Sequence, residues 1–448
     1  MATTKITPSE SAQTNTQTPP AHPSAAATST ASKKAPAEAQ KKRPKEKYPR
    51  LYSLDAYRGL IMISLAFGGF GLAGTAQRHL AHLAQNPDDG STQLWETIYH
   101  HFHHVDWTGW GYWDLIQPSF MFMVGVSMAY SYTKRAAMGH SWFRMFGHVV
   151  WRSLVLILLG VFLSSNGKDQ TNWSFMNVLA QIGLGYSFLF IFWRFPWKAQ
   201  ALGIALILVG TWAIYTLEPN TGIDLENGAA EVGVSAEWAQ EHLKDLSPAW
   251  HKNANIGQHI DLYLLNNFPR KNAFIYNGGG YQTLNFIPSL ATMLFGLMAG
   301  ELLRSSHSHK RKFWTLIIAG ALGLIIGQNL DLAGVIPMVK RIWTPSWVLY
   351  SAGWCSLILA VLYGIIDIMK WRWGAYPLIV VGVNSLLMYF MAMLFVPWTR
   401  GMLKTHLGED AFNVLGEMNS PFVQATAVGL FFWLICWYLY RQKIFLRI

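Results

Sequence analysis

Residues 178–217 decide the fold and read VLAQIGLGYSFLFIFWRFPWKAQALGIALILVGTWAIYTL. The stretch holds two long apolar runs that are separated only by the basic turn Arg194-Phe195-Pro196-Trp197-Lys198. The proline of this turn ends one helix and allows the next to begin. Each run is long enough to cross a hydrocarbon core of about 30 Å. The stretch therefore predicts a transmembrane hairpin whose basic turn lies in the cytoplasm.

Similar apolar runs recur along the whole chain. Of its 448 residues, 52% are hydrophobic and only 13% are charged, which does not fit a soluble surface. The sequence predicts an all-α membrane protein, a bundle of about ten transmembrane helices. The expected spans begin near Asp55, Trp113, Val149, Val178, Ala199, Thr283, Phe313, Trp347, Pro377 and Phe422.

The basic residues follow the predicted topology. In a soluble protein a net charge of +11 would suggest a nucleic-acid partner, but here Lys and Arg concentrate in alternate connections. We therefore expect membrane lipid around the protein, no nucleic acid, and both termini in the cytoplasm. The basic inner connections contain Lys134, Arg135, Arg144, Arg194, Lys198, Arg304, Lys310, Arg311, Lys312, Lys370 and Arg372.

Composition also divides the chain into segments. Residues 1–49 are rich in Ala, Thr, Ser, Pro and Lys, lack the apolar core of a signal peptide and predict a disordered basic cytoplasmic tail. Residues 50–448 form the expected membrane domain. Its outer segments 77–112 and 218–282 exceed the usual connection length and are candidates for function.

Small and sulfur-containing residues within the apolar runs have a structural interpretation. Gly296 and Gly300 lie four residues apart, a spacing that favours close packing of two helices. Cys355 and Cys436 both lie inside apolar runs, so we interpret them as packing residues rather than an external disulfide.

The first outer segment ends in the densest polar and aromatic cluster of the sequence. Residues 100–114 read HHFHHVDWTGWGYWD, with four histidines and two carboxylates. No second segment supplies further ligands, so we predict no metal site. A histidine beside a carboxylate suits general-base chemistry near neutral pH, whereas solvated interfacial histidines remain the alternative.

A second polar motif opens the first span and reads SLDAYRG at residues 53–59. Asp55 and Arg58 are three residues apart, so they share one face of a helix and can pair. A structural ion pair is one interpretation, with Arg58 reaching toward the interface. The other is that Arg58 receives an anionic group such as a phosphate.

Several motifs occur in a specific order: SLDAYRG at 53–59, HVDWTG at 104–109, DLIQPSFMFMVGVS at 114–127, IPMVKRIWTPS at 336–346 and GVNSLLMY at 382–389. In this order they resemble the transmembrane acyltransferases related to heparan-alpha-glucosaminide N-acetyltransferase and their bacterial homologues. The resemblance implies that acetyl-CoA binds from the cytoplasm and that its acetyl group passes to an outer sugar hydroxyl or amine. It also implies a multi-pass protein of a bacterial inner membrane.

The resemblance assigns roles to particular residues. His104 matches the family's active-site histidine, and Asp114 is expected to orient it. We expect the donor to be held by Arg58, Asp55, Lys340 and Asn384, and the acceptor to be bound by Trp107 and Trp110. A homodimer stays open.

The sequence departs from the family pattern at three positions. Gly69 stands where the family usually has Asn, Ala180 changes the motif before the fourth span, and Gln117 replaces an apolar residue. These departures keep open a catalytically silent envelope protein that binds glycan or lipid. A transporter or flippase is the other alternative, although the chain shows no evident two-fold repeat of polar-interrupted segments.

Overall fold

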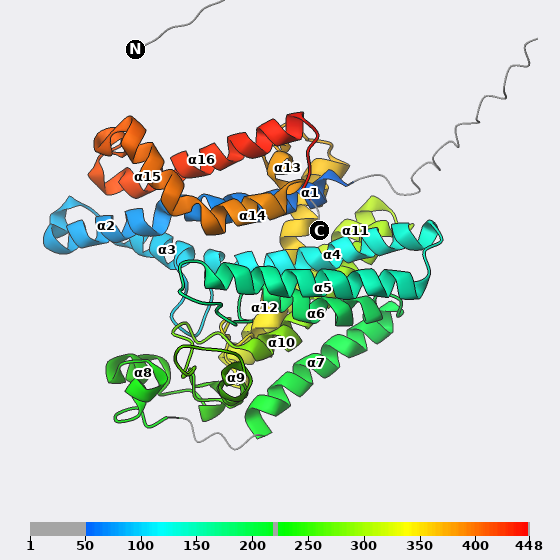
Figure 1. Ribbon diagram of the computed structural model, residues 1–448, viewed down its shortest axis with the longest axis horizontal. Helices are drawn as coiled ribbons and strands as arrows, with labels where there is room; N and C mark the ends of the chain where they lie inside the picture. Colours follow the sequence, from blue (N-terminus) through cyan, green and yellow to red (C-terminus); the bar gives the residue numbers. More distant parts are fainter. Residues whose placement is uncertain (1–50, 218–222, 447–448) are drawn as a thin grey trace, which may run out of the picture. The chain divides into compact units, whose positions relative to one another are not determined.

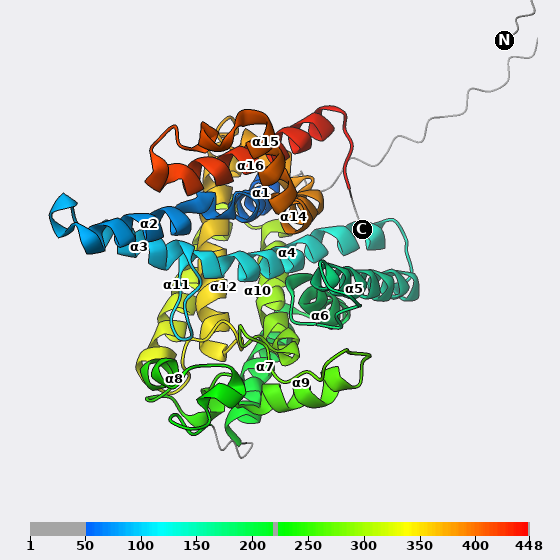
Figure 2. The same ribbon diagram turned by 60° about the vertical axis from the view of Figure 1, so that its left-hand side comes forward.

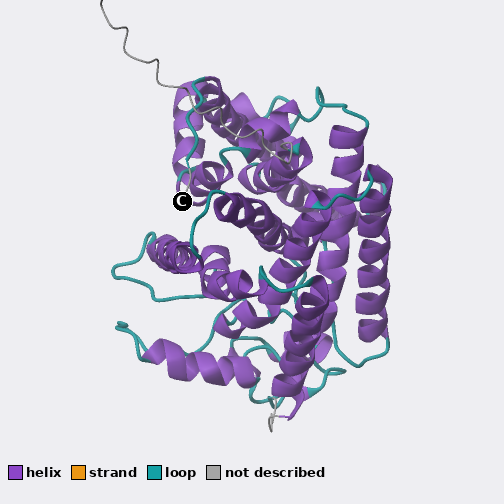
Figure 3. Ribbon diagram, turned by 90° about the vertical axis from the view of Figure 1, so that its right-hand side faces the viewer, coloured by secondary structure: helices purple, strands orange, loops and turns teal. Residues whose placement is uncertain are grey.

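The computed structural model of the chain is shown in Figure 1, and residues 51–217 and 223–446 are described. The expected disordered tail, residues 1–49, lies outside these residues. The described residues form an all-helical protein in which helices and loops are present and strands are not (Figure 3). The α-helices are α1 Tyr52–Ala66, α2 Leu72–Gln85, α3 Gln93–Phe102, α4 Ile116–Ala137, α5 Trp142–Ser165, α6 Val178–Phe192, α7 Trp197–Leu217, α8 Ala236–His242, α9 Ile256–Asn266, α10 Phe286–Arg304, α11 His309–Leu332, α12 Pro345–Leu362, α13 Tyr376–Gly382, α14 Ser385–Leu394, α15 Val396–Leu407 and α16 Ser420–Arg441.

The chain is a multi-pass membrane protein. Six of its described helices are long and apolar enough to span a bilayer, or up to eight spans if each bent helix pair counts as one. The bent pairs are α1 with residues 68–85, which meet at 46°, and α13 with α14, which meet at 79°. The expected count of ten is therefore approximate. The two other expected spans are α4, which is enclosed by neighbouring helices and tolerates polar residues, and α6, which has only 15 residues.

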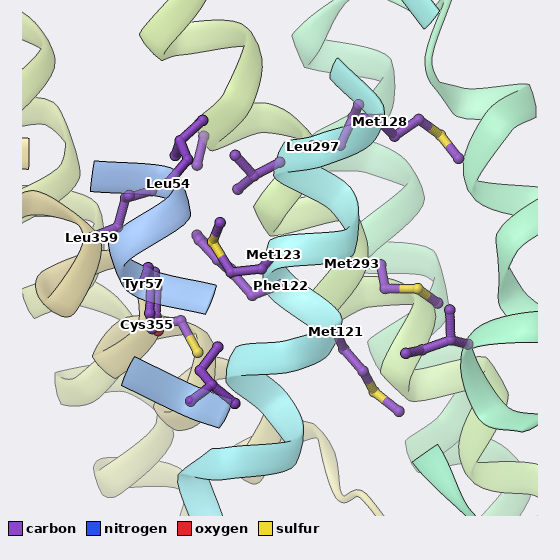
Figure 4. Close-up of a cluster of buried hydrophobic side chains, with 14 of the residues drawn as sticks. Leu54, Tyr57, Met121, Phe122, Met123, Met128, Met293, Leu297, Cys355 and Leu359 are labelled. Carbon is purple, nitrogen blue, oxygen red and sulfur yellow. The ribbon is translucent and has the colours of Figure 1, made fainter. Parts of the chain in front are cut away.

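The main core takes buried side chains from most of the described helices, and α4 contributes many of them. α4 packs against α1, α10 and α12 and contributes side chains to all three interfaces. Figure 4 shows the centre of this cluster, where methionines and Phe122 of α4 meet side chains of the other helices. Leu54, Tyr57, Phe122, Met293, Leu297, Cys355 and Leu359 are each at most 7% exposed. The core positions α4, whose first turn carries part of the site.

Glycines bring α4 and α10 into backbone contact. A Cβ atom built on Gly125 would lie 1.9 Å from the Met293 carbonyl oxygen, and one on Gly296 would lie 1.9 Å from the Phe122 carbonyl oxygen. Gly300 lies one turn farther along the same seam, where an added Cβ atom would be 2.8 Å from the Val126 carbonyl oxygen. The close packing predicted for Gly296 and Gly300 is therefore present, and α4 is the partner helix.

The connections between spans build a second layer at one end of the bundle. Residues 103–111, 166–177, 267–285 and 333–344 meet there, and we call this the His104 end. Figures 1 and 2 show α8 and α9 at the lower end of the bundle, away from α14 and α16. Their segment has its own apolar core, in which the Trp107 indole donates to the Trp250 carbonyl at 2.9 Å.

The glycine seam between α4 and α10 gives a stability prediction. Gly125→Ala is expected to lower the melting temperature of the purified protein by several degrees, because the new methyl group collides with fixed backbone and overpacking costs about 1–3 kcal/mol. Differential scanning fluorimetry in detergent measures the change. Gly147→Ala is the matched control, since nothing lies within 4 Å of that position on α5. Equal melting temperatures for the two variants would contradict the seam.

Candidate functional site

His104, Asp114 and Lys340 converge at the His104 end. The His104 Nδ1 atom lies 2.7 Å from Asp114 Oδ1, and the Lys340 Nζ atom donates to the same oxygen at 3.0 Å. Nζ also lies 3.1 Å from His104 Nδ1. Asp114 and Lys340 are nearly buried, whereas 40% of the His104 side chain is exposed. The arrangement leaves the imidazole as the member that faces open space.

Asp114 owes its position to the backbone around it. It lies in the short helical turn Tyr112–Leu115 that leads into α4. Its Oδ2 atom accepts the backbone N–H of Gly111 at 3.1 Å and that of Val105 at 3.4 Å. Both carboxylate oxygens therefore have donors, which makes burial of the charge tolerable.

The bonding of Asp114 also fixes the imidazole. A contact of 2.7 Å to an ionised carboxylate oxygen requires a proton on His104 Nδ1. Lys340 therefore donates to Asp114 rather than to Nδ1. Nε2 is left as the unprotonated, basic nitrogen of His104, the tautomer suited to removing a proton.

Charge and burial set the ionisation of the pair. Burial of His104 and the nearby Lys340 ammonium lower the pKa of the imidazole below 6.5, against the opposing effect of Asp114. Burial acts to raise the pKa of the Asp114 carboxyl, but the His104 hydrogen bond and the Lys340 charge outweigh it and hold the pKa at about 2. At neutral pH the site therefore contains a neutral imidazole and an ionised carboxylate.

Arg341 ties the connections around the site together. Its guanidinium group donates to the Val105 carbonyl oxygen at 3.0 Å and to the Gly279 carbonyl oxygen at 2.8 Å. It also lies over the Tyr281 ring, 5.7 Å from the centroid. Arg341, which follows Lys340 in the sequence, thus joins the loop of His104 to the segment before α10.

A cavity of about 400 Å³ opens in front of His104 and Lys340. α1, α4 and α14 supply an apolar wall, and the loops at the His104 end supply most of the polar groups. The volume is in the range of small-molecule sites, and such a mixture of apolar wall and few polar groups is typical of them. The other lining residues are Ile61, Met62, Leu65, Trp113, Ile116, Gln117, Phe120, Ser164, Ser174, Met176, Asn177, Val178, Asn277, Tyr281, Tyr389 and Met393.

The other residues predicted to bind the acetyl donor do not line this cavity. Asp55 and Arg58 pair at 3.4 Å, and Arg58 also donates to the Ser127 hydroxyl of α4. Arg58 precedes the first lining residue, Ile61, by three residues on α1. Asn384 is fully buried and holds the C-terminal segment through the Ile444 carbonyl and the Leu446 N–H, each at 3.0 Å.

The two tryptophans predicted for the acceptor lie beside the site rather than in the cavity wall. Trp107 is fully buried in the apolar core that also contains Trp250. Trp110 is partly buried and packs against Tyr350 and Trp354 of α12. Trp113, which was not predicted, lines the cavity with its ring centroid 6.3 Å from that of His104.

The histidine cluster does not converge on one point. His100 bonds the Trp110 carbonyl oxygen at 3.0 Å, and His103 stacks on Tyr99 at 4.8 Å. His104 is the member of the cluster that lines the cavity. Within the described ranges no group of three or more His, Cys, Asp or Glu side chains is arranged to hold a metal ion.

The positions that depart from the family pattern lie close to the cavity. Gly69 has a left-handed backbone with φ of 59°, and its missing side chain would point at the rings of Phe102 and Trp113. Gln117 lines the cavity. Ala180 is fully buried, and its N–H is accepted by the side chain of Asn177, which also lines the cavity.

Sequence reasoning missed several polar lining residues. Asn177, Asn277 and Tyr281 come from loops that no motif marks, and they reach the cavity only because those loops meet at the His104 end. Tyr389 could have been found, since it closes the GVNSLLMY motif.

Comparison with known proteins gives one family. The family description "Heparan-alpha-glucosaminide N-acetyltransferase, catalytic" matches residues 93–231, a range that includes His104 and Asp114. Two curated relatives named heparan-alpha-glucosaminide N-acetyltransferase are similar to the chain. The Homo sapiens protein is 24% identical over 455 residues and the Mus musculus protein is 23% identical over 435. Each alignment covers 89% of this chain, which spans only 60% of the relative's length.

The ionisation of His104 can be tested without any assay of activity. Diethyl pyrocarbonate modifies neutral imidazole, so we expect the pH midpoint of His104 modification, resolved by peptide mass spectrometry, to lie below 6.5. Lys340→Gln should move the midpoint upward, because the imidazolium ion no longer faces a buried cation. Lys404→Gln on the distant α15 should leave it unchanged. A midpoint that Lys340→Gln does not move would show that the lysine has no electrostatic effect on His104.

Proposed function

The chain is related to the heparan-alpha-glucosaminide N-acetyltransferase family, and from this premise we propose that it is a membrane-bound acetyltransferase. In this proposal acetyl-CoA is the donor and a sugar hydroxyl or amine is the acceptor. The observation that carries it is that His104 and Lys340 line the same cavity while both contact the buried Asp114 carboxylate. His104 belongs both to the motif that carries the family resemblance and to the cavity wall, which supports the proposal.

His104 acts as the general base. The acceptor oxygen or nitrogen attacks the thioester carbonyl carbon while Nε2 takes its proton, and the tetrahedral intermediate then expels the coenzyme A thiolate. The proton on Nε2 returns to that thiolate, so the products are the acetylated sugar and coenzyme A. Asp114 keeps Nδ1 protonated and stabilises the imidazolium ion that forms between these steps.

Lys340 has a separate part in this mechanism. Its ammonium group neutralises Asp114 and keeps His104 uncharged before the reaction. It also lines the cavity, so its positive charge favours the oxyanion of the tetrahedral intermediate. Trp107 and Trp110 support the acceptor side through the loop that carries His104.

Donor binding uses the other side of the cavity. Arg58 lies three residues before Ile61 on α1, about 4.5 Å along the helix from the cavity wall. Arg58, oriented by its partner Asp55, therefore receives the donor's phosphates while the thioester end extends toward His104. Asn384 acts at a distance in this scheme, by holding the C-terminal segment against the α13–α14 break.

The orientation in the membrane follows the distribution of basic residues. The proposal places both termini and the basic connections in the cytoplasm of a bacterium, and the His104 end outside the inner membrane. The donor then enters from the cytoplasm and the acceptor from outside. A homodimer is compatible with this arrangement.

A loss of activity at His104 is the first test. Purified protein is incubated with radiolabelled acetyl-CoA and candidate glycans, and His104→Ala is expected to lower turnover by about 10²–10⁴-fold, as for a lost general base. His103→Ala is the matched control, because that neighbouring ring stacks on Tyr99 outside the cavity. Full activity of His104→Ala, or no turnover by the wild type with any acceptor, would contradict the proposal.

Arg58→Ala separates donor binding from the chemical step. Titration calorimetry of coenzyme A should show weaker binding to this variant, because a charge-assisted bond to phosphate is lost far from the reacting atoms. Coenzyme A should bind His104→Ala with nearly wild-type affinity. If Arg58→Ala reduces only the yield of folded protein, and the folded fraction binds coenzyme A normally, Arg58 is a structural partner of Asp55 instead.

A further inference from the structure

A basic cluster lies between α4, α5 and α6, and the proposed acetyl transfer does not use it. Arg135 of α4 donates to the His148 Nε2 atom of α5 at 3.0 Å. One turn farther along α5, Arg152 donates to the Tyr186 hydroxyl of α6 at 3.1 Å and covers its ring at 4.9 Å. Both guanidinium groups act electrostatically on His148 and on Tyr132. We call Arg135, His148 and Arg152 the basic cluster.

The positive charge of this cluster is not compensated by the protein. Arginine can only donate, so His148 accepts at Nε2, carries its proton on Nδ1 and is neutral. Two permanent charges therefore remain, from Arg135 and Arg152. In the part of the chain that the structure describes, no Asp or Glu forms an ion pair with a member of the cluster.

The surroundings of the cluster are apolar and outward-facing. Neighbouring residues on α5 are strongly exposed, with Trp151 at 64% and Leu154 at 46%, as expected for a helix against lipid. Arg152 lies ten residues, or about 15 Å, from the first residue of α5, and Arg135 lies two residues before the end of α4. The cluster thus runs inward from the end of the bundle opposite His104.

An uncompensated guanidinium group at this depth is costly unless an anion reaches it. A water-soluble anion would have to leave water for a lipid-facing surface, whereas the phosphate of a lipid already lies at the membrane interface with its chains against the apolar surface. Arginine pairs with phosphate through two parallel hydrogen bonds, which Lys or a single N–H cannot reproduce. Basic pockets between spans are a recurrent way of holding anionic lipid headgroups.

We propose that Arg135, His148 and Arg152 form a binding site for the phosphate of an anionic membrane lipid, whose chains lie along the exposed face of α5. Arg152 supplies the deeper contact and Arg135 the outer one. His148 joins them, since a phosphate oxygen can replace Nε2 as the acceptor for Arg135. This site is separate from the His104 cavity, with which it shares none of the lining residues.

The test uses the purified full-length protein and native mass spectrometry with phosphatidylglycerol and phosphatidylcholine. We expect the wild type to retain phosphatidylglycerol preferentially, and the double variant Arg135→Gln with Arg152→Gln to bind it roughly tenfold to thirtyfold more weakly. Arg144→Gln is the matched control. It removes one positive charge from an exposed position of the same helix, and it should bind as the wild type does. Unchanged affinity in the double variant would overturn the proposal.

Two further measurements identify the source of the phosphate and test the site without relying on a variant that folds. Glycerol 3-phosphate and coenzyme A should fail to displace the lipid at equal concentration, and displacement by either would assign the cluster to a soluble phosphate. In the wild type, a photoreactive phosphatidylglycerol should label peptides of α4 and α5 within residues 130–155. Labelling confined to other parts of the chain would refute the site even if the double variant did not fold.

Discussion

The Asp114 carboxylate is the interaction on which the rest of the site depends. It is 1% exposed, and its two oxygens accept from His104, from Lys340 and from the backbone of Val105 and Gly111. The most distant donor, Lys340, lies 226 residues from Asp114 in the sequence, so one buried charge fixes the loop of His104, the start of α4 and the turn before α12. Loss of any donor would leave a buried charge poorly satisfied, which is far more costly than the net gain of one hydrogen bond. The same carboxylate selects the imidazole tautomer, so the fold and the chemistry at His104 rest on one group.

Apolar runs predicted the helices well because a span must satisfy its backbone hydrogen bonds internally and face lipid. They were least informative for α4, which faces other helices, and for α6, which is short. Motif order predicted His104 and Asp114, but neither spacing nor composition could show that Lys340 touches both, since their contact depends on tertiary folding across 226 and 236 residues. Trp107 was predicted to bind the acceptor, but it lies in an apolar core. The sequence could not show this, because an aromatic residue in a polar motif can serve packing or binding equally well.

Polar side chains occur in two settings, between packed segments and in the wall of the cavity. Asn384 holds the C-terminal segment, and Arg58 links Asp55 of α1 to Ser127 of α4 outside the cavity wall. Lys340, Asn177 and Tyr281 face the cavity with His104. The apolar wall from α1, α4 and α14 excludes water from one side of the imidazole, which strengthens every electrostatic interaction within the site. In the proposed reaction, this environment favours transfer of the acetyl group to the acceptor over hydrolysis of the thioester.

The central claim is that His104 Nε2 faces the acyl group of a bound donor. The most direct measurement is an electron cryomicroscopy structure with a non-reactive ketone analogue of acetyl-CoA in which a methylene group separates sulfur from the carbonyl. If His104 is the general base, density for the analogue is expected in the cavity lined by His104, Lys340 and Trp113. The carbonyl should leave room for an acceptor atom about 3–3.5 Å away and within hydrogen-bond reach of Nε2. An analogue bound with its carbonyl outside this cavity, or turned away from His104, would contradict it.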